Sequence, residues 1–581
     1  MHAHPWHTRA CLAALCAMLT LPFLNPHHFN PLPTFYPEWT AAACALLAAT
    51  LLLRAEVFPR LTLPPASLLP FGLGALALAH LVLGKAPAPS LALLVLLYLL
   101  WAVLLLVLGR ALADHLGLAA LATPCAIALL FGSLLSAFLL ACQLIDPALG
   151  LGWVFAHVKG GGNLAQANHL ANYLWLGLVS ALFLFARGTL GTPMFAVCAV
   201  LLIAAASLTG SRSVFLYAGG IALLTTWTAR RQPSLILRRT ALAALAMFLV
   251  CLALQPVFTH FQIGSQLQAS VAGERMFREV SGIPLRLQLW HTAWALFTAA
   301  PWLGNGVGQF PYTAFELAGE HPGVFVGGEH AHNIIMQLLA EYGILGGLLL
   351  IGVAVVWWLR FVRAAWTIER LWLACCLLII AVHSLLEYPL WHTFFLGIAA
   401  LLLGAGSQGG WRPHLSPASR LLLCGVLLLG SVTLINLGRD YRSLEHTLNP
   451  RLRASGEPQD WASSVTTLSA LHRSSLFAHY VELVYAFQLT VDHDTLADKI
   501  TVCEHALRFS PADVIAYKYA YLLALDGRSE EAKRALTRAM ASHPGHIPEA
   551  ARLLADLQRN YPELAALHAI LVAGAKGTGA T

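Results

Sequence analysis

"SLALLVLLYLLWAVLLLVLG", residues 90–109, decides the fold class of this chain. These 20 residues carry no charged side chain, and an α-helix of this length can cross the hydrocarbon core of a bilayer. Similar apolar runs recur along the 581 residues, of which 58% are hydrophobic and only 11% are charged. The sequence therefore predicts an all-α protein, a polytopic bundle of membrane helices.

About 13 membrane spans are expected from these apolar runs. The first run looks like a signal peptide, but no small-x-small cleavage site follows it, so we expect it to be retained as a span. The expected spans are centred on residues 10–24, 40–53, 66–83, 90–108, 119–142, 169–186, 192–209, 213–228, 240–257, 334–358, 371–386, 390–404 and 420–437.

Lysine and arginine are distributed unevenly between the two sides of this bundle. With a cytoplasmic N-terminus, the segments before residue 439 that face the cytoplasm hold 14 of them and the outer segments hold six. This excess predicts a multi-pass membrane protein, and an odd number of spans then places the C-terminal region on the outer side. It also accounts for most of the net charge of +7, so no nucleic-acid partner is expected. The six outer groups are candidates for binding an anion: Lys85, Lys159, Arg212, Arg275, Arg278 and Arg286.

The composition changes after residue 438, which predicts a transmembrane domain at 1–438 and a soluble helical domain at 439–581 on the outer side. The second segment carries 15 basic and 16 acidic residues and has no run long enough to span a membrane. Its single cysteine, Cys503, cannot form a disulfide within the domain, and the other cysteines lie in or beside spans. Cysteine chemistry is therefore not the expected function.

Residues 503–544 of this tail resemble a tetratricopeptide repeat of about 34 residues. The small and large apolar positions fall close to that pattern at Ala506, Tyr519, Ala520, Leu523, Gly527, Ala532, Leu536 and Ala539. Two interpretations stay open. The tail is either a docking surface for a protein or another subunit, or a helical domain that only packs on the membrane part.

Two long loops are expected on the outer face, at about 143–168 and 258–333. Loops of this length usually have a role, and both are predicted on the same side. In the second loop Leu287, Trp290 and Trp294 share one helical face with Phe297. This pattern favours a helix that lies in the membrane interface.

The segment "GGEHAHNIIMQLLAEYGILGG", residues 327–347, places polar groups directly before a span. Asn333 suits the N-cap, so the helix N-terminus should lie beside the His332 imidazole, attract phosphate and disfavour a protonated ring. A neutral His332 beside a bound anion is suited to act as a general base. Two alternatives stay open: an interfacial histidine that caps its own helix, and a metal site of Glu329, His330 and His332. On a helix two residues are about 200 degrees apart, which argues against the metal site.

Arginine and amide side chains are expected at the same depth on the outer face. Arg212 follows the seventh span in "LTGSRSVF", where an arginine is a functional candidate or an interfacial anchor. Arg286 begins the amphipathic helix, where contact with a lipid headgroup is an equal alternative. Gln166 and Asn168 open the sixth span.

Two further segments complete this outer ring. "EYPLWH" contributes Tyr388 together with Glu387 and His392 at the junction of two spans. "GNGVGQF", residues 304–310, is a tight turn. No strand precedes this glycine run, so a dinucleotide-binding function is excluded.

The order of these motifs resembles the O-antigen ligase and polymerase superfamily, and most closely the bacterial protein O-oligosaccharyltransferases that glycosylate pilins. The motifs are "QAN", "SRS", Arg-x-x-x-Trp, Gly-x-Gly-x-Gly, "HAHN" and "EYPLWH", and the resemblance covers about 151–404. It implies a GT-C-like glycosyltransferase of the cell inner membrane that moves a preassembled glycan from undecaprenyl pyrophosphate to an acceptor hydroxyl at the periplasmic face. The outer loops and the domain at 439–581 would then be periplasmic. The implied activity uses no metal and no cofactor.

The resemblance also implies roles for individual residues. His332 is the implied catalytic histidine, Arg212 and Arg286 the pyrophosphate ligands, and Gln166 and Tyr388 supporting polar residues. Asn333 and Asn168 join them as candidate substrate-binding groups. The implied partners are the lipid-linked glycan, membrane lipids and an acceptor protein such as pilin.

Two other functions remain open at this point. The same site would serve an O-antigen ligase or polymerase whose acceptor is the lipid A core or a growing glycan. A lipid-linked glycan transporter is a more distant alternative. It predicts polar residues at the bilayer midplane and internal repeats, whereas the ionisable groups of this chain cluster toward one face.

Overall fold

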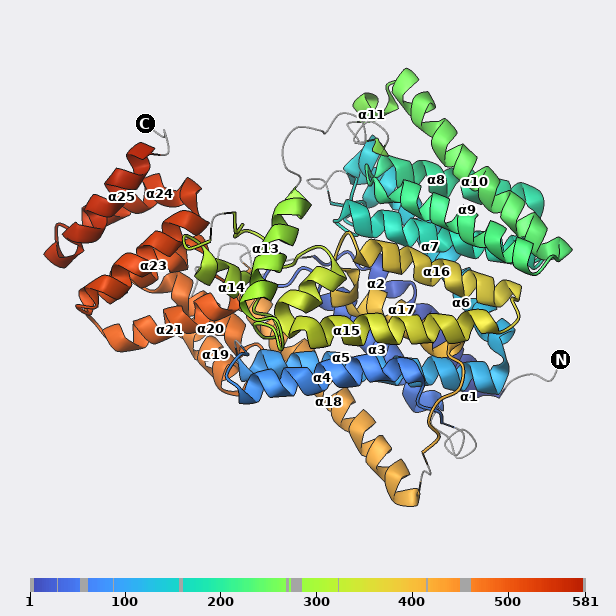
Figure 1. The fold of residues 1–581 in the computed structure, drawn as a ribbon, viewed down its shortest axis with the longest axis horizontal. Helices are drawn as coiled ribbons and strands as arrows, with labels where there is room; N and C mark the ends of the chain where they lie inside the picture. Colours follow the sequence, from blue (N-terminus) through green and yellow to red (C-terminus); the bar gives the residue numbers. More distant parts are fainter. Residues whose placement is uncertain are drawn as a thin grey trace. The chain divides into compact units, whose positions relative to one another are not determined.

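The computed structural model describes residues 5–28, 30–52, 61–86, 88–155, 160–267, 271–272, 285–321, 323–413, 416–449 and 461–577. Within these ranges every regular element is a helix, and the only extended pairing is an isolated antiparallel bridge between Leu63 and Trp411. The predicted all-α class is confirmed (Figure 1).

The helices of the first half of the chain are α1 (Trp6–Met18), α2 (Leu21–Leu24), α3 (Phe35–Leu52), η2 (Pro65–Ser67), α4 (Leu68–Val82), α5 (Pro89–Leu116), α6 (Leu118–Ile145), η3 (Pro147–Gly150), α7 (Ala167–Ala186), α8 (Thr192–Leu208), α9 (Ser213–Arg231), α10 (Leu235–His260), α11 (Ile263–Gln266) and α13 (Leu285–Ala299). Those of the second half are α14 (Phe310–Leu317), α15 (Ile334–Arg363), α16 (Ile368–Ser384), η4 (Pro389–Trp391), α17 (Thr393–Gly406), α18 (Pro417–Leu448), α19 (Trp461–Ser474), α20 (Ala478–Gln488), α21 (Leu496–Phe509), α22 (Asp513–Leu525), α23 (Ser529–Ser542), η6 (Pro544–His546), α24 (Ile547–Leu557), η7 (Pro562–Leu564) and α25 (Ala565–Gly577).

Nine helical segments in the described part of the chain are long and apolar enough to cross a membrane. They correspond to nine of the expected spans, and the protein is a polytopic membrane protein. The other four expected spans fall on α8, α9, α16 and α17, which are helices of 14 to 19 residues. The number of spans, about 13, therefore stays a prediction.

The chain forms two compact units. Unit 1 consists of Met1–Phe71, Leu100–Gly282 and Ile351–Gly438, and unit 2 consists of Gly72–Leu99, Ile283–Leu350 and Arg439–Thr581. Unit 2 thus combines the tail with most of α4, the start of α5, the part of the second predicted outer loop from Ile283 on and the first part of α15. Each unit has its own hydrophobic core. The division at residue 438 into a membrane domain and a tail is a prediction that these units do not test.

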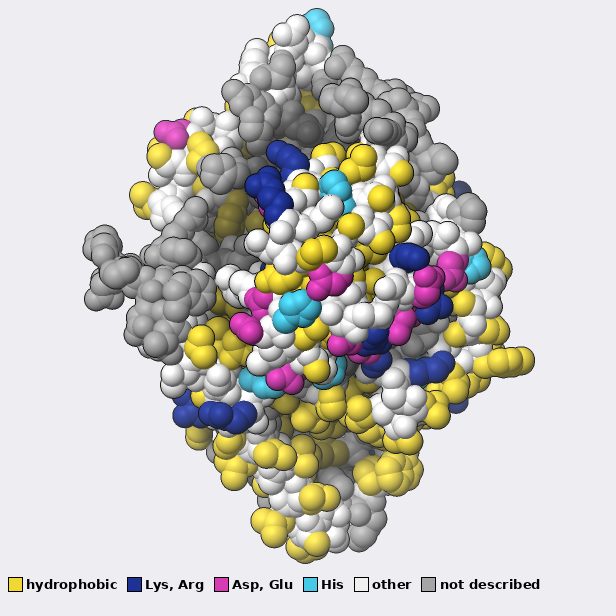
Figure 2. All heavy atoms as spheres, turned by 90° about the vertical axis from the view of Figure 1, so that its left-hand side faces the viewer, with side chains coloured by type: hydrophobic (Ala, Val, Ile, Leu, Met, Phe, Trp, Pro, Cys, Tyr) yellow, Lys and Arg dark blue, Asp and Glu magenta, His cyan; other side chains and the backbone are white. Residues whose placement is uncertain are grey.

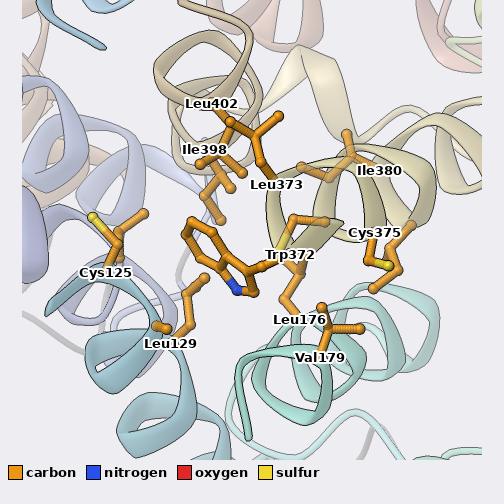
Figure 3. Close-up of a cluster of buried hydrophobic side chains, with 14 of the residues drawn as sticks. Cys125, Leu129, Leu176, Val179, Trp372, Leu373, Cys375, Ile380, Ile398 and Leu402 are labelled. Atoms are coloured by element: carbon orange, nitrogen blue, oxygen red, sulfur yellow. The ribbon is translucent and has the colours of Figure 1, made fainter. Parts of the chain in front are cut away.

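The core of unit 1 is built around α7, whose residues from His169 to Leu184 are all buried. Figure 3 shows the Trp372 indole of α16 enclosed by apolar side chains of α6, α7, α16 and α17. Its Nε1–H donates to the Ser180 hydroxyl of α7 at 3.1 Å, so the buried indole nitrogen is satisfied. Burial of this set fixes α16 and α17 against the helix that carries the predicted amides.

Large apolar side chains are exposed on the outside of the unit 1 helices. Leu223 is 74% exposed, Leu421 is 76% exposed, and Phe131 and Phe138 are each 62% exposed. A water-soluble protein would not leave so many large apolar groups uncovered. Lipid chains cover such surfaces in a membrane, which is consistent with the predicted spans.

In unit 2 the tail helices pack with the short helix α14 of the outer loop (Figure 1). Phe315 of α14 is 4% exposed and belongs to the same buried cluster as Leu523 and Leu536 of the tail. On the surface, Arg538 of α23 forms an ion pair of 2.9 Å with Glu316 of α14. The tail and the outer loop therefore share a core and form one folding unit.

The tail contains the helix-turn-helix that the sequence predicts. Helices α22 and α23 are joined by a turn at Gly527, whose φ of 78° favours glycine. Ala520, Leu523, Ala532 and Leu536 are buried between these helices. That this pair is a tetratricopeptide repeat stays a prediction.

Acidic, basic and histidine side chains are interspersed on the face shown in Figure 2.

Candidate functional site

In unit 1, Gln166 and Asn168 lie at the start of α7, as predicted. The Gln166 side-chain oxygen accepts a hydrogen bond of 2.5 Å from the backbone N–H of His169, which makes Gln166 the N-cap of the helix. Asn168 Nδ2 donates to Glu387 Oε1 at 2.7 Å. Both amides therefore have structural partners, and the second joins α7 to the loop between α16 and α17.

Tyr388 lies in the same cluster. Its ring centroid is 6.0 Å from that of His169 and 5.8 Å from that of His392. Glu387, its neighbour in sequence, is 4% exposed, and its backbone N–H donates to the His383 carbonyl at 2.7 Å. The predicted residues Gln166, Asn168 and Tyr388 are thus brought together in one place.

The cluster also contains polar residues that were not predicted. His169 and His383 are buried with ring centroids 5.4 Å apart, and His383 Nδ1 lies 3.0 Å from the Tyr217 hydroxyl of α9. From α3, Glu38 accepts the backbone N–H of Thr393 at 2.5 Å. A histidine in the expected span at 371–386 was a usable signal, because ionisable groups inside spans usually have a function.

Arg212 occupies the N-cap position of α9, in the turn "GSRS", and is exposed. Ser211 and Ser213 on either side are buried with their hydroxyl oxygens 2.7 Å apart. Gly160 approaches this turn so closely that a Cβ there would lie 2.8 Å from the Thr209 carbonyl oxygen. The backbone of this turn is therefore closely packed, while the Arg212 side chain is exposed, as expected for a junction between spans.

Arg286 lies in the first turn of α13 in unit 2 and is partly exposed. On α13, Leu289, Ala293 and Leu296 are buried against α14 and Ala331. Helix α13 therefore packs directly on the segment that leads to His332.

The opposite side of α13 carries the apolar face that the sequence predicts. Leu287 is 49% exposed and Trp294 is 53% exposed, and the Trp294 ring lies 5.2 Å from that of Phe297. An exposed apolar stripe on a helix with one buried side suits a position in a membrane interface. The interfacial location itself stays a prediction.

His332 has an uncommon backbone conformation, with φ of 51° in the left-handed region. For a residue with a side chain this conformation costs about 1–2 kcal/mol, and it persists only where the surroundings enforce it. Such residues cluster at active sites and ligand-binding turns. The predicted catalytic histidine therefore lies at one of the five non-glycine positions with positive φ in the described part of the chain.

Asn333, directly after His332, caps α15 as predicted. Its Oδ1 accepts hydrogen bonds from the backbone N–H groups of Ile335 at 3.0 Å and Met336 at 3.2 Å. The cap fixes the start of the helix beside the imidazole. His332 and Arg286 belong to unit 2, whereas Arg212, Gln166, Asn168 and Tyr388 belong to unit 1.

Helix α15 is interrupted at Gly343, which has φ of 64° and ψ of −162°. The segment before the break, Ile334–Tyr342, is a short half-helix that begins at the Asn333 cap. A helix break inside an apolar environment requires new partners for the freed backbone groups. The sequence did not predict this break.

The segment from Pro301 to Gly306, which includes the start of the glycine run, supplies those partners. Backbone N–H groups of Asn305 and Gly306 donate to the carbonyls of Ala340 at 3.1 Å and Glu341 at 3.0 Å. On the other side of the break, the N–H of Ile344 donates to the Pro301 carbonyl at 2.8 Å. The motif "GNGVGQF" is thus a support for a broken helix, and its glycines permit close backbone approach.

The end of α4 and the loop after it also bind the start of the glycine run and the residue before it. Lys85 Nζ donates to the Gly304 carbonyl at 2.8 Å, and His80 Nε2 lies 2.8 Å from the Leu303 carbonyl oxygen. Lys85 was one of the predicted anion-binding candidates. In the structure the Lys85 ammonium group instead donates to the Gly304 carbonyl.

The alternative metal site at Glu329, His330 and His332 is not assembled in the described ranges. No group of three or more His, Cys, Asp or Glu side chains there has an arrangement that could hold a metal ion. Two other outer basic residues, Arg275 and Arg278, and also Lys159, lie outside the described residues.

Two protein-family models match this chain. Residues 197–351 match the family described as O-Antigen ligase, and residues 371–558 match the family described as virulence factor membrane-bound polymerase, C-terminal. The first match contains Arg212, Arg286 and His332, and the second contains Tyr388 and most of the tail. The matched segments together cover the second outer loop and the junction of α16 with α17.

A curated relative covers most of the chain. The General O-oligosaccharyltransferase of Acinetobacter baylyi (strain ATCC 33305 / BD413 / ADP1) is 29% identical over 412 residues, which is 68% of this chain and 69% of the relative. The family matches and this relative agree with the resemblance that the motifs suggested.

Proposed function

Because this chain belongs to the O-antigen ligase superfamily, we propose that it is an oligosaccharyltransferase that glycosylates proteins. It would transfer a preassembled oligosaccharide from undecaprenyl pyrophosphate to Ser or Thr hydroxyls of periplasmic or pilin-like proteins. The similarity to a General O-oligosaccharyltransferase over 412 residues supports this reaction class. A membrane-embedded glycosyltransferase can take a donor whose lipid chain stays in the bilayer.

The two arginines suit a pyrophosphate ligand. Arg212 is at the N-cap of α9, and Arg286 is in the first turn of α13. A cation at a helix N-terminus is disfavoured by about 0.3–1 kcal/mol through the helix dipole, and a bound anion reverses this effect. Guanidinium groups also bind phosphate oxygens in a bidentate manner. Both positions therefore favour a negatively charged ligand.

His332 would act on the acceptor. In the proposed step the acceptor hydroxyl oxygen forms a bond to the anomeric carbon, and its proton moves to the His332 imidazole. The bond between the anomeric carbon and the phosphate oxygen breaks, and undecaprenyl pyrophosphate leaves with the electron pair. A single displacement of this kind inverts the anomeric centre. General-base catalysis contributes typically about 10² to 10⁴ in rate.

One observation carries this proposal more than any other: the left-handed backbone of His332 immediately before a capped helix N-terminus. Backbone strain held by its surroundings is typical of functional sites. The helix N-terminus adds a favourable potential for the developing negative charge on the leaving pyrophosphate. Substrate binding would be supported by Asn168, Gln166 and Tyr388. Asn333 would support it indirectly, because its side chain caps the helix that begins beside His332.

Reconstitution tests the proposal. Purified protein is mixed with undecaprenyl-pyrophosphate-linked glycan and a pilin-like acceptor, and intact-protein mass spectrometry measures glycan on Ser or Thr. We expect transfer that persists in EDTA, because the proposed step uses no metal ion. Absence of transfer to every protein acceptor, with transfer to lipid A core or to glycan instead, would overturn protein glycosylation in favour of the second candidate.

That second candidate is an O-antigen ligase or polymerase. The descriptions of the two matching families favour it, because one is a ligase and the other a polymerase. The donor and the chemical step would be the same, and only the acceptor hydroxyl would differ. A strain that lacks this protein separates the two, since it loses either glycosylated protein or long lipopolysaccharide.

The proposal also requires that the active site and the tail be periplasmic in the inner membrane. Reporter fusions after Arg239 and Gly410 should give a cytoplasmic signal, and fusions near Gly328 and Gly456 a periplasmic one. A cytoplasmic signal at Gly456 would place the tail on the wrong side for presenting a periplasmic acceptor.

A further inference from the structure

A chain of buried hydrogen bonds links the break in α15 to the backbone next to His332. Gln337 and Glu341, one helical turn apart on the half-helix, are 1% and 4% exposed. Gln337 Nε2 donates to Glu341 Oε1 at 3.0 Å. Gln337 Oε1 accepts the backbone N–H of Ala331 at 2.6 Å. Ala331 is itself fully buried and directly precedes His332.

The far end of this chain is attached to the glycine run. The Glu341 carboxylate accepts hydrogen bonds from the backbone N–H groups of Gly308 and Phe310. The Glu341 carbonyl is also the partner of the Gly306 N–H at 3.0 Å. The same residue therefore anchors the loop through its side chain and through its backbone.

His332 is consequently fixed on both sides. The N–H of the residue before it is bound by Gln337, and the side chain of the residue after it, Asn333, caps the same half-helix. These two hydrogen-bonded contacts hold the peptide groups on either side of His332. They therefore fix the residue with the left-handed φ of 51°. A short helix that ends at Gly343 thus determines the position of one imidazole.

We propose that Gln337 and Glu341 are positioning residues for His332, which they orient through Ala331 without touching the substrate. The inference rests on the proposed role of His332 as the general base. It explains why two polar side chains are buried in an otherwise apolar helix, where each must be fully hydrogen-bonded to be tolerated. The positioning role also gives a reason for the break at Gly343. The glycine run packs at this break, where its backbone contacts Glu341.

Substitution of Gln337 by Met tests the inference, because Met has a similar length and forms neither hydrogen bond. In purified protein we expect Gln337→Met to lower kcat about 10- to 100-fold, since small misplacements of a catalytic group have effects of this size. The KM for the lipid-linked glycan should stay within about twofold. Glu341→Gln replaces one of the two acceptor oxygens with an NH2 group, which cannot accept from Gln337 or from the backbone N–H groups, so it should lower kcat in the same direction.

Gln255→Met is the matched control. Gln255 donates to Ser207 Oγ at 3.0 Å in a span of unit 1, so the substitution also removes a side-chain amide from a helix without affecting Ala331. Its kcat should be unchanged. A kcat of Gln337→Met equal to wild type would overturn the inference, as would equal losses in kcat for Gln337→Met and the control.

A double-mutant cycle separates positioning from a general loss of structure. When His332 is already replaced by Ala, Gln337→Met should have no further effect on the residual rate, because it acts through the missing imidazole. A further loss equal to that in the wild-type background would show that Gln337 acts elsewhere. The two hypotheses fail differently. Full activity of His332→Ala would remove the proposed function, whereas normal activity of Gln337→Met alone would remove only the positioning role.

Discussion

The Asn168 side-chain amide donates a 2.7 Å hydrogen bond to the Glu387 carboxylate, which joins the first turn of α7 to the loop between α16 and α17. Hydrogen bonds to charged groups contribute about 1.5–3 kcal/mol. Asn168→Asp would place two carboxylates at this distance. We expect it to lower the melting temperature of the purified protein and to reduce transfer at least tenfold, measured in the reconstituted assay.

The matching rescue is Glu387→Gln in the same molecule. The new amide can donate to the aspartate at position 168, so the double variant should recover most of the stability and activity. If Asn168→Asp alone behaves as wild type in both assays, this contact does not hold the junction.

His332→Ala should abolish transfer while expression and membrane insertion stay normal. A loss of about 10² to 10⁴ in rate is the usual result of removing a general base. His330→Ala should have a much smaller effect, because His330 is two residues away from the capped, left-handed position. Glycan transfer by the two purified variants is the measurement. Equal losses that added zinc restores would instead support a metal site.

The apolar runs predicted the nine long apolar helices, because the length of a membrane helix and the absence of charge are local properties of the sequence. The Asn333 cap could be predicted for the same reason, since an N-cap acts on the three residues that follow it. The break at Gly343 could not, because glycine is common in spans and a break depends on a distant partner. Here that partner is the segment around Asn305, more than 30 residues earlier.

In unit 1, His392 was named from its motif, but its partner Glu38 was missed for a similar reason. Glu38 contacts His392 at 2.8 Å across 354 positions of sequence, and nothing near Glu38 indicates this partner. By contrast, Gln166, Asn168 and Tyr388 were identified as part of motifs, and their proximity is a result of packing between α7 and the end of α16. The sequence motifs therefore identified individual residues, whereas the packing of the helices determines which of these residues contact one another.

Arg212→Lys and Arg212→Ala should weaken binding of the lipid-linked glycan to a similar extent, by about 10- to 100-fold. If Arg212 binds the pyrophosphate, its planar fork provides geometry that an ammonium group cannot reproduce. His332→Ala should leave donor binding largely intact, because the base acts on the acceptor. Binding is measured by titrating a fluorescent lipid-linked glycan into the purified protein.

Arg231→Lys provides the control, because Arg231 lies at the other end of α9, 5.2 Å from the Trp227 ring. It should leave donor binding unchanged. Unchanged binding in both Arg212 variants would mean that Arg212 is only an interfacial anchor, and the search for the pyrophosphate site would move to Arg286.

Acid should destabilise the tail through His479. Burial lowers the pKa of His479 from 6.5 to about 4, so the folded tail keeps this ring neutral. Between these two values the unfolded chain binds a proton that the folded chain does not, and stability therefore falls as the pH drops from about 6.5 to about 4. The loss should be about 1–3 kcal/mol. Hydrogen exchange in α20, corrected for the intrinsic rate, measures it.

His479→Gln should flatten this pH dependence. His505→Gln is the control, because the His505 side chain is 50% exposed and its removal should leave the slope unchanged. The same slope in wild type and His479→Gln would assign the acid sensitivity to another group, such as His543, whose pKa burial also lowers.

Gly306→Ala should inactivate the protein by displacing the glycine run from the break in α15. Gly306 has φ of 119°, which disfavours any side chain, and a Cβ there would collide with the Lys85 carbonyl oxygen. The bond from its N–H to the Glu341 carbonyl would then be lost, and with it the support of the half-helix that precedes Gly343. We expect a stability loss of about 1–3 kcal/mol and a fall in transfer of at least tenfold.

Gly352→Ala is the matched control, since Gly352 lies in α15 beyond the break and a Cβ there has no neighbour within 4 Å. That variant should be as stable as wild type or slightly more stable, because alanine is the better helix former. Thermal unfolding in detergent and the transfer assay compare the two, and full activity of Gly306→Ala would mean that the glycine run does not support the site.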